Sequence, residues 1–322
     1  MKKSEEVEIV NYLKEVLEKT KTEATFNTKI LKIEDKVFFI INFNNIVNLS
    51  SLCDNWDSST LSRNLIIVLQ QPRRENLSLG IISKTNDYSR SLLFYSLNLS
   101  LLDSINQFLN ELEDEDLSSV EPDFKIQWND SIFHKNKRLS NIRVNSNNKS
   151  KINSIIELNV NSSSSFISEN GIPTTQGCVR EFTRILIDLN HFEEILLVNL
   201  NYRLSQLSES KEIIREVNEI LKLKNKEVKF YYDKKVVLSG KLQGINENGD
   251  ALLENNGIVS SEKADYVASQ TSLKNSETYN KCHCISQFTD KRSIKFYYFF
   301  TASVLTLFAR FFYNRNKSGI KA

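Results

Sequence analysis

The placement of glycine is the feature that most limits how this chain can fold. The chain has eight glycines, and Gly80 is the only one before Gly171. Four of the others are crowded into one short segment, at Gly240, Gly244, Gly249 and Gly257. A glycine-rich phosphate loop needs backbone N–H groups that no Cβ atom shields. We therefore expect no such loop in the first half of the chain, and closely spaced turns in the second half.

The segment 227–259 is predicted to form a small β domain. Its apolar runs VKFYY, KVVLSGKLQGI and DALLEN are separated by turn signals at residues 233–235, 246–249 and 255–257. Short strands with dense turns are typical of a small β-barrel, and an ordinary β-meander predicts the same elements. Gly249 follows Asn248 in a turn that requires positive φ at one or both positions.

The first 225 residues have the pattern of a mixed sheet with helices. Apolar residues at helical spacing predict helices at 4–20, at 92–112 and, in two or more pieces, at 179–223. Short apolar runs predict strands at 36–43, 64–70, 78–83 and 151–160. We expect residues 139–144 to pair with 151–160 as a hairpin across the polar turn 145–150.

Composition and charge exclude some classes of function. The net charge is +2, so no overall field attracts nucleic acid, and we expect no nucleic-acid partner. The cluster Cys282-His283-Cys284 offers only three ligands, which is weak as a zinc site, so we expect no metal site. The start, MKKSEEVEIV, has no apolar signal segment, which predicts a cytoplasmic protein with reduced cysteines.

Four motifs occur in an order that resembles the biotin protein ligases, also called holocarboxylase synthetases. KIQWND at 125–130 is followed by a basic hairpin with Arg138-Leu139, a strand ending in Asn159, and GKLQGINENGDALLENNG at 240–257. In that family the strand reads K-W-P-N-D, and the hairpin carries Lys-(Leu/Ile)-x-Gly-(Ile/Val). A G-x-N motif follows, and the C-terminal barrel carries G-x-(D/N)-x-x-G-x-L. The resemblance covers residues 36–261.

The resemblance implies an α/β (α+β) fold: a class II synthetase-like mixed sheet with helices, followed by a small SH3-like β-barrel. The sequence adds a C-terminal apolar helix. We expect an N-terminal helical extension at 1–34, a catalytic domain at 35–225, the barrel at 226–267, a linker at 268–290 and the apolar segment at 291–322.

The resemblance also implies a reaction and its components. In the family, biotin attacks the α-phosphate of ATP to give biotinyl-5′-AMP, and a lysine of a carboxyl-carrier domain then takes the biotin. The implied small molecules are ATP, Mg²⁺ and biotin, and the implied partner is a biotin-accepting carrier domain. Two anions must meet in such a site, so fixed cations have to offset their repulsion.

Several residues match the family motifs, some with changes. Trp128, Asn129 and Asp130 match W-N-D, and Lys125 lies two residues before the place of the family lysine. Arg138 replaces the hairpin lysine that holds the biotin carboxyl and the α-phosphate. Asn141 and Glu157 replace two family glycines, and Asn159 matches the asparagine of G-x-N.

The family's phosphate loop, G-R-G-R-x-x-N-x-W, is degenerate here. It should follow the strand at 64–70, where the chain reads QQPRRENLSLG. Its remnants are Gln71, Arg73, Arg74 and Asn76. The resemblance thus implies Arg138, Arg73 and Arg74 as catalytic residues. It implies substrate or ATP binding by Gln71, Asn76, Lys125, Trp128, Asn129, Asp130 and Asn159.

Each of these residues also has an ordinary structural explanation. Trp128 on a strand is commonly a core residue, Asn129-Asp130 a turn, and Arg73-Arg74 a surface pair. A catalytically inactive homologue that acts as a binding or carrier-docking protein therefore stays open beside the ligase. Lipoate attachment uses a related fold, and the C-terminal barrel argues against it.

The C-terminal segment resembles a membrane anchor. Residues 296–309 carry no charge, and Lys291, Arg292 and Lys295 precede them, while Arg315, Lys317 and Lys321 follow. A spanning helix needs about 20 apolar residues, so a run this short also fits an interfacial or core helix. Tyr297, Tyr298 and Tyr313 lie near the ends, as aromatic residues do at membrane interfaces. We expect an anchor here, with the main domains facing the cytosol.

Overall fold

The computed structural model describes residues 3–57, 61–62, 64–72, 75–84, 90–112, 123–128, 131–144, 151–164, 175–232, 235–262 and 266–269. Strand β2 (Lys36–Phe43) explains how its central sheet is built. Phe38 and Ile40 lie in one buried cluster, whereas Phe39 and Ile41 lie in another. Because successive side chains point to opposite faces of a strand, both faces of this sheet are covered.

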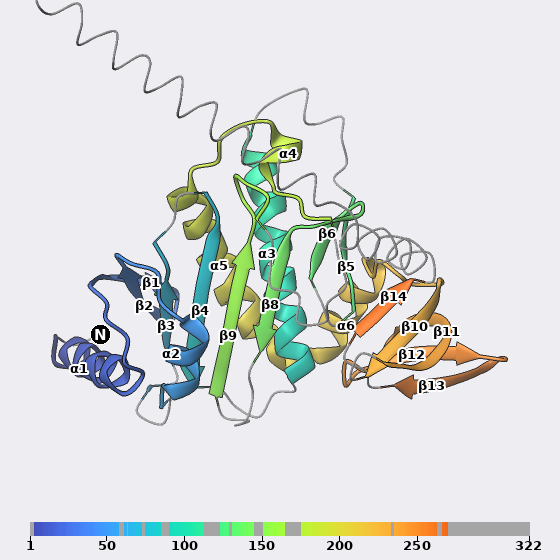
Figure 1. Ribbon diagram of the computed structural model, residues 1–322, viewed down its shortest axis with the longest axis horizontal. Helices are drawn as coiled ribbons and strands as arrows, with labels where there is room; N and C mark the ends of the chain where they lie inside the picture. The colour runs from blue at the N-terminus through green and yellow to red at the C-terminus, as the bar shows by residue number, and fades with distance from the viewer. Residues whose placement is uncertain are drawn as a thin grey trace, which may run out of the picture. The chain divides into compact units, whose positions relative to one another are not determined.

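The central sheet has six strands in the order β1-β2-β3-β4-β9-β8 (Figure 1). Its other strands are β1 (Phe26–Ile33), β3 (Leu65–Gln70), β4 (Leu77–Lys84), β8 (Ser140–Val144) and β9 (Lys151–Leu158). Strands β2 and β3 pair in parallel, and all other neighbours are antiparallel. The fold is therefore a mixed α/β sheet with helices, as the sequence predicted.

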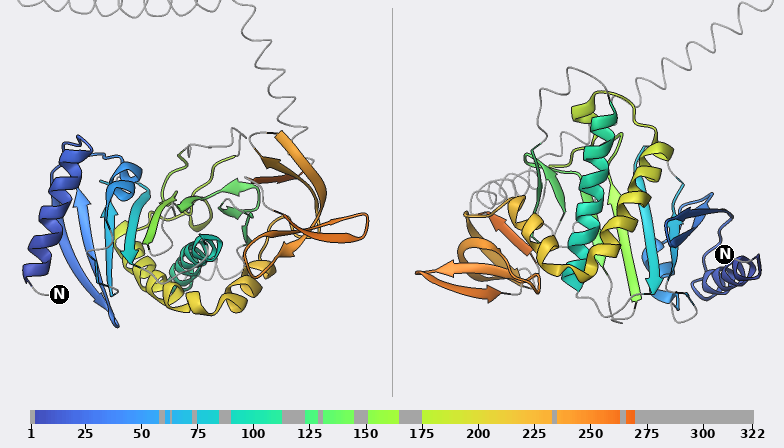
Figure 2. Two further views of the ribbon diagram at one scale, coloured as in Figure 1. Left: turned by 90° about the horizontal axis from the view of Figure 1, so that it is seen from below. Right: turned by 180° about the vertical axis from the view of Figure 1, so that it is seen from behind.

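Helices cover the two faces of the sheet. The first buried cluster contains side chains of α3 (Arg90–Glu111), α5 (Leu189–Ser205) and α6 (Ser210–Glu219). The second contains side chains of α1 (Lys3–Lys19) and α2 (Leu49–Asn55). Figure 2 shows α3 and α5 in front of the strands when the molecule is seen from behind. A short helix, α4 (Arg180–Thr183), and a 3-10 turn, η2 (Gln206–Ser208), complete the helical part that the structure describes.

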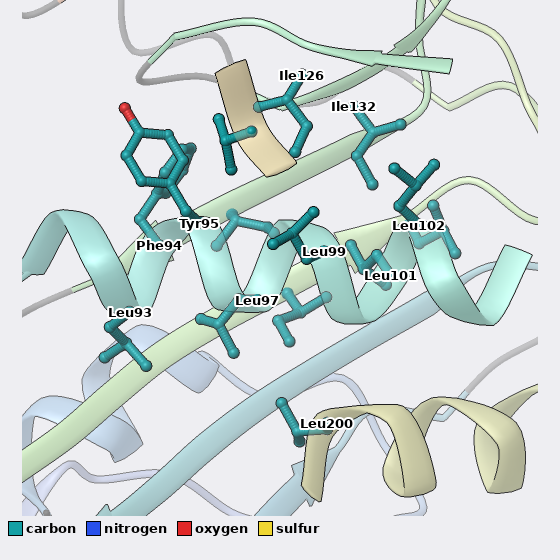
Figure 3. Close-up of a cluster of buried hydrophobic side chains, with 14 of the residues drawn as sticks. Leu93, Phe94, Tyr95, Leu97, Leu99, Leu101, Leu102, Ile126, Ile132 and Leu200 are labelled. Carbon is teal, nitrogen blue, oxygen red and sulfur yellow. The ribbon is translucent and has the colours of Figure 1, made fainter. Parts of the chain in front are cut away.

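Helix α3 is buried around most of its circumference. Figure 3 shows Ile126 and Ile132 pointing toward one side of the helix and Leu200 approaching from another. Ile126 and Ile132 belong to a small sheet of β5 (Phe124–Ile126), β6 (Ile132–His134) and β7 (Lys137–Arg138). This small sheet lies beside the helix and carries the basic hairpin.

The remaining strands form a five-stranded antiparallel sheet in the order β13-β12-β11-β10-β14. They are β10 (Glu227–Tyr232), β11 (Lys235–Ile245), β12 (Ala251–Asn255), β13 (Ile258–Glu262) and β14 (Tyr266–Ser269). Gly249 has φ +81° in the turn between β11 and β12, so the predicted positive φ is confirmed. The strands lie where an SH3-like barrel was expected, and closure into that barrel stays a prediction.

The structure corrects the sequence analysis at three elements. Strand β1 lies inside residues 1–34, which were expected to be a helical extension, and it pairs with β2 over its full length. Helix α2 was not predicted, because it has only seven residues and its polar and apolar positions give no clear period. Strand β14 crosses the expected start of the linker at 268, because it pairs with β10 as far as Ser269.

A partly buried ion cluster joins three helices on the α3 side of the sheet. Arg203 of α5 donates from Nε to Asp103 Oδ2 at 2.6 Å, and its Nη2 lies 2.8 Å from Glu216 Oε2. Its Nη1 donates to Gln206 Oε1 at 3.1 Å. Because Asp103 lies on α3 and Glu216 on α6, one guanidinium fixes the packing of all three helices.

The expected C-terminal apolar helix and anchor at 291–322 lie outside the described residues, as does Cys282-His283-Cys284. Within the described part of the chain, no helix combines the length and the apolar character needed to cross a membrane. Cys53 and Cys178, the two described cysteines, are both free and buried.

Candidate functional site

Arg138 lies at the centre of a buried polar cluster. It is the second residue of β7 and pairs with Phe133 of β6, and the residue is only 6% exposed. Its Nε donates to Ser131 Oγ at 2.7 Å and to the backbone oxygen of Ser140 at 3.0 Å. Its Nη2 donates to Asn141 Oδ1 at 2.8 Å. The guanidinium is thus oriented by the polypeptide itself.

The neighbouring strand extends this cluster with a second charged group. Asn141 Nδ2 donates to Glu157 Oε2 at 2.6 Å, and the two residues are direct cross-strand partners on β8 and β9. Arg143 Nη2 lies 3.8 Å from the same Glu157 oxygen. The cluster therefore contains two cations, one carboxylate and an amide that bridges Arg138 and Glu157.

Asn159 organises the chain just beyond β9. Its side chain is fully buried, and its Nδ2 donates to the backbone oxygens of Ser164 and Gly177, each at 3.0 Å. Its Oδ1 accepts from Ser164 Oγ at 2.7 Å. Because both the oxygen and the nitrogen of this buried amide make hydrogen bonds, Asn159 fixes the loop that follows the strand.

Gly177 connects Asn159 to Arg138. The backbone N–H of Gly177 donates to the backbone oxygen of Arg138 at 3.0 Å, while its own oxygen accepts from Asn159. A Cβ atom on Gly177 would lie 2.8 Å from Lys137 Cβ, so only glycine lets this segment run so close to β7. Arg138 and Asn159, separated in sequence, are therefore parts of one structure.

Asn76 belongs to the same structure. Its Oδ1 accepts from the backbone N–H groups of Val160 and Ser162, at 2.9 and 3.3 Å. Its Nδ2 donates to Ser162 Oγ at 3.2 Å and to Ser164 Oγ at 3.0 Å. Three of the predicted site residues, Asn76, Arg138 and Asn159, are thus brought together by the fold.

Other predicted site residues lie apart from this group. Gln71 donates from Nε2 to the backbone oxygen of Val47 at 2.5 Å. Lys125 forms an exposed ion pair with Asp123 at 3.3 Å. Trp128 is 5% exposed and packs on Phe230 with 5.6 Å between ring centres. The remaining four, Arg73, Arg74, Asn129 and Asp130, lie outside the described residues.

Lys137, next to Arg138, points to a different carboxylate. Its Nζ lies 2.5 Å from Glu181 Oε2, and Ser163 Oγ donates to Glu181 Oε1 at 2.6 Å. Burial alone would raise the pKa of Glu181, but the hydrogen bonds from Lys137 and Ser163 hold that pKa below its ordinary value. Lys137 thus pairs with Glu181, whereas the adjacent Arg138 is linked to Glu157 through Asn141.

Four residues of the cluster were not predicted from the sequence: Ser131, Ser140, Ser164 and Gly177. Serine is so common in this chain that its position carries no signal. Gly177 could have been found, because Gly171 and Gly177 are the only glycines between Gly80 and Gly240, and a glycine in such a region indicates a close approach of two backbones.

Within the ranges that the structure describes, no group of three or more His, Cys, Asp or Glu side chains could hold a metal ion. The magnesium ion that the resemblance implies stays a prediction.

The mixed α/β fold of this chain is similar to that of solved biotin protein ligases. The apo biotin protein ligase from Aquifex aeolicus matches with a TM-score of 0.56 and 18% identity, over 72% of this chain and 98% of that one. The same ligase in complex with biotin and ATP matches with a TM-score of 0.54 and 17% identity, over 71% and 97%.

A biotin protein ligase-like protein of unknown function from Silicibacter sp. TM1040 also matches. Its TM-score is 0.52 and its identity 10%, over 72% of this chain and 96% of that one. No family model and no curated protein sequence matches the chain. The predicted resemblance is confirmed at the level of the fold: this chain has the fold of the biotin protein ligases, in a divergent form.

Proposed function

We propose that this protein is a biotin–[carboxyl-carrier protein] ligase. It would form biotinyl-5′-AMP from biotin and ATP and transfer the biotin to a carrier-domain lysine. The observation that carries the proposal is the buried side chain of Arg138 within a biotin ligase fold. Gly177 connects this residue to Asn159, because it bonds the backbone oxygen of Arg138 and accepts from the Asn159 amide.

The first step requires a fixed cation between two anions. An oxygen of the biotin carboxylate attacks the α-phosphorus of ATP, the bond to the β-phosphate oxygen breaks, and pyrophosphate leaves. Negative charge builds up on the α-phosphate during this attack, and a guanidinium held in place stabilises it without reorganising. Arg138 is assigned that role, because Ser131 and Ser140 already fix its orientation from one side.

The second step requires an attacking amine. The carrier lysine, as a free amine, attacks the acyl carbon of the adenylate, AMP leaves, and the amine loses a proton. Asn76 and Asn159 are assigned to hold the loop 159–164 against the hairpin, since their side chains satisfy its backbone groups.

The other predicted residues take supporting roles in this proposal. Arg73, Arg74 and Gln71 would attract the outer phosphates, although arginines without glycines cannot wrap a phosphate closely. Lys125, Asn129 and Asp130 would face the nucleotide. The edge of the Trp128 ring would form one wall of the adenine site, because the ring itself packs on Phe230.

A second candidate function is favoured by a specific observation. Arg138 already donates three hydrogen bonds to its own chain, and Asn141 links it to Glu157. A ligand anion would have to share the guanidinium with these partners. A catalytically inactive homologue, which keeps the fold and docks a carrier domain, needs Arg138 only for these internal contacts.

One experiment separates the two candidates. The purified protein is incubated with biotin, ATP, Mg²⁺ and labelled pyrophosphate, and label entering ATP is followed. The ligase proposal predicts exchange that depends on biotin and is lost in Arg138→Ala. If the wild-type protein binds a biotin carrier domain but gives no biotin-dependent exchange, the ligase proposal is wrong and the docking protein stands.

A further inference from the structure

Asn141 connects a cation and an anion through one side-chain amide. Its Oδ1 accepts from Arg138 Nη2 at 2.8 Å, and its Nδ2 donates to Glu157 Oε2 at 2.6 Å. The amide cannot be reversed without placing its oxygen against a carboxylate and its N–H groups against a guanidinium. The positions of Arg138 and Glu157 therefore fix each other through Asn141.

The burial of the cluster changes from one end to the other. Ser131 and Ser140, which hold Arg138 Nε, are fully buried, and Asn141 is 6% exposed. The side chain of Glu157 is 31% exposed and that of Arg143 is 26% exposed. The solvent-facing end of the cluster thus carries the carboxylate of Glu157 beside Arg143.

We propose that Glu157 determines which form of the substrate acyl group this site accepts. This inference rests on the proposed binding of biotin at Arg138. A substrate carboxylate that reaches Arg138 would bring a second negative charge close to Glu157, and like charges in a partly buried site repel each other strongly. An uncharged acyl group, such as a carboxamide, avoids that repulsion.

Glu157 would therefore lower the affinity of the site for a charged carboxylate, relative to an uncharged analogue of the same ligand. Selectivity of this kind arises because the charged ligand makes an unfavourable contact. Favourable contacts with the preferred ligand would not by themselves exclude the other one.

The test compares biotin with biotinamide, its uncharged carboxamide, by calorimetric titration. Glu157→Gln removes the charge and keeps an oxygen that accepts from Asn141. We expect this variant to shift the ratio of the two dissociation constants toward biotin by about tenfold, which is the change for about 1.4 kcal/mol. Glu181→Gln is the matched control, because Glu181 pairs with the neighbouring Lys137, and its ratio should equal that of the wild type.

Thermal unfolding of both variants confirms that they are folded before the titrations are compared. If biotin and biotinamide bind but Glu157→Gln leaves their ratio unchanged, Glu157 does not select the acyl group and only this inference is wrong. If neither ligand binds the wild type or either variant, the proposed biotin site is wrong as well. An equal shift in Glu181→Gln would also overturn the inference, because the effect would then be general.

Discussion

The indole Nε1 of Trp128 donates a hydrogen bond to the backbone oxygen of Gly249, 3.2 Å away. The hydroxyl of Tyr95 on α3 donates to the same oxygen at 3.3 Å. One carbonyl in a turn of the five-stranded sheet is therefore bonded to the chain beyond β5 and to the central helix. Trp128 satisfies its buried N–H and, through this contact, attaches the five-stranded sheet to the rest of the unit.

This attachment predicts that Gly249 cannot be replaced without a large loss of stability. Alanine there has a strained φ of +81°, and its Cβ would lie 2.2 Å from Ser91 Cβ. We expect Gly249→Ala to lower the free energy of unfolding by about 3 kcal/mol, from strain and overpacking together. Denaturant unfolding measures the change.

Gly257→Ala is the matched control for that variant. Its φ is +78°, but nothing lies within 4 Å of the added Cβ, so it should show the strain alone, about 1 kcal/mol. Equal losses in the two variants would show that the Gly249 turn does not pack on α3. Because the turn is packed there, we also expect the five-stranded sheet and the α/β part to unfold in one transition.

Arg203 is predicted to stabilise the helical layer through its ion cluster. Arg203→Leu leaves Asp103 and Glu216 near each other without their shared cation, and we expect a loss of about 3 kcal/mol in unfolding free energy. Arg215→Leu is the control, because Arg215 forms its ion pairs with Glu212 and Glu219 on the exposed surface of α6. A loss in the control as large as that in Arg203→Leu would contradict the assignment.

The surroundings of His134 predict that the stability of the protein depends on pH. Burial beside Phe124 and Phe182, and then the charge of Lys135, lower the pKa of His134 below its ordinary value. The unfolded chain thus binds the proton more tightly than the folded chain. The contribution of His134 to stability is complete above its ordinary pKa, about 6.5, and is lost as the pH falls below that value.

His134→Phe removes this titration and keeps an aromatic ring between its neighbours. Urea unfolding between pH 8 and pH 5 should show a smaller fall in stability for the variant than for the wild type. Parallel curves would mean that His134 titrates alike in both states.

Much of the fold could be predicted from the sequence, because burial on both faces gives continuous apolar runs. Strand β2 has the bounds that its run KVFFIINF predicted, and the hairpin of β8 and β9 is confirmed by their register. Strand β1 was missed because it is an edge strand, FNTKILKI, whose exposed residues break the apolar run. Its position depends on pairing with β2, which a local pattern does not contain.

The site was harder to predict, since its contacts join segments that are distant in sequence. Arg138 and Asn159 could be named from motifs, but the role of Gly177 between them follows only from the folded chain. Within the basic hairpin, Lys137 is exposed whereas Arg138 is buried, because alternate residues of a strand face opposite sides.

The C-terminal segment carries a prediction that depends on the sequence alone. The full-length protein and a truncation ending at Asp290 are expressed side by side, and membranes are extracted with alkaline carbonate. We expect the full-length chain to stay in the membrane pellet, because residues 296–309 carry no charge and have basic flanks. Equal release of both proteins into the soluble fraction would rule out the anchor.

The most direct test of the proposed site is the affinity for biotinyl-5′-AMP with and without Arg138. Arg138→Ala removes charge-assisted hydrogen bonds, so we predict that binding weakens by about tenfold to a hundredfold. Lys137→Ala is the matched control on the same strand, since Lys137 pairs with Glu181, and its affinity should equal that of the wild type. An unchanged affinity in a folded Arg138→Ala protein would contradict the assignment of Arg138 as the cation of the site.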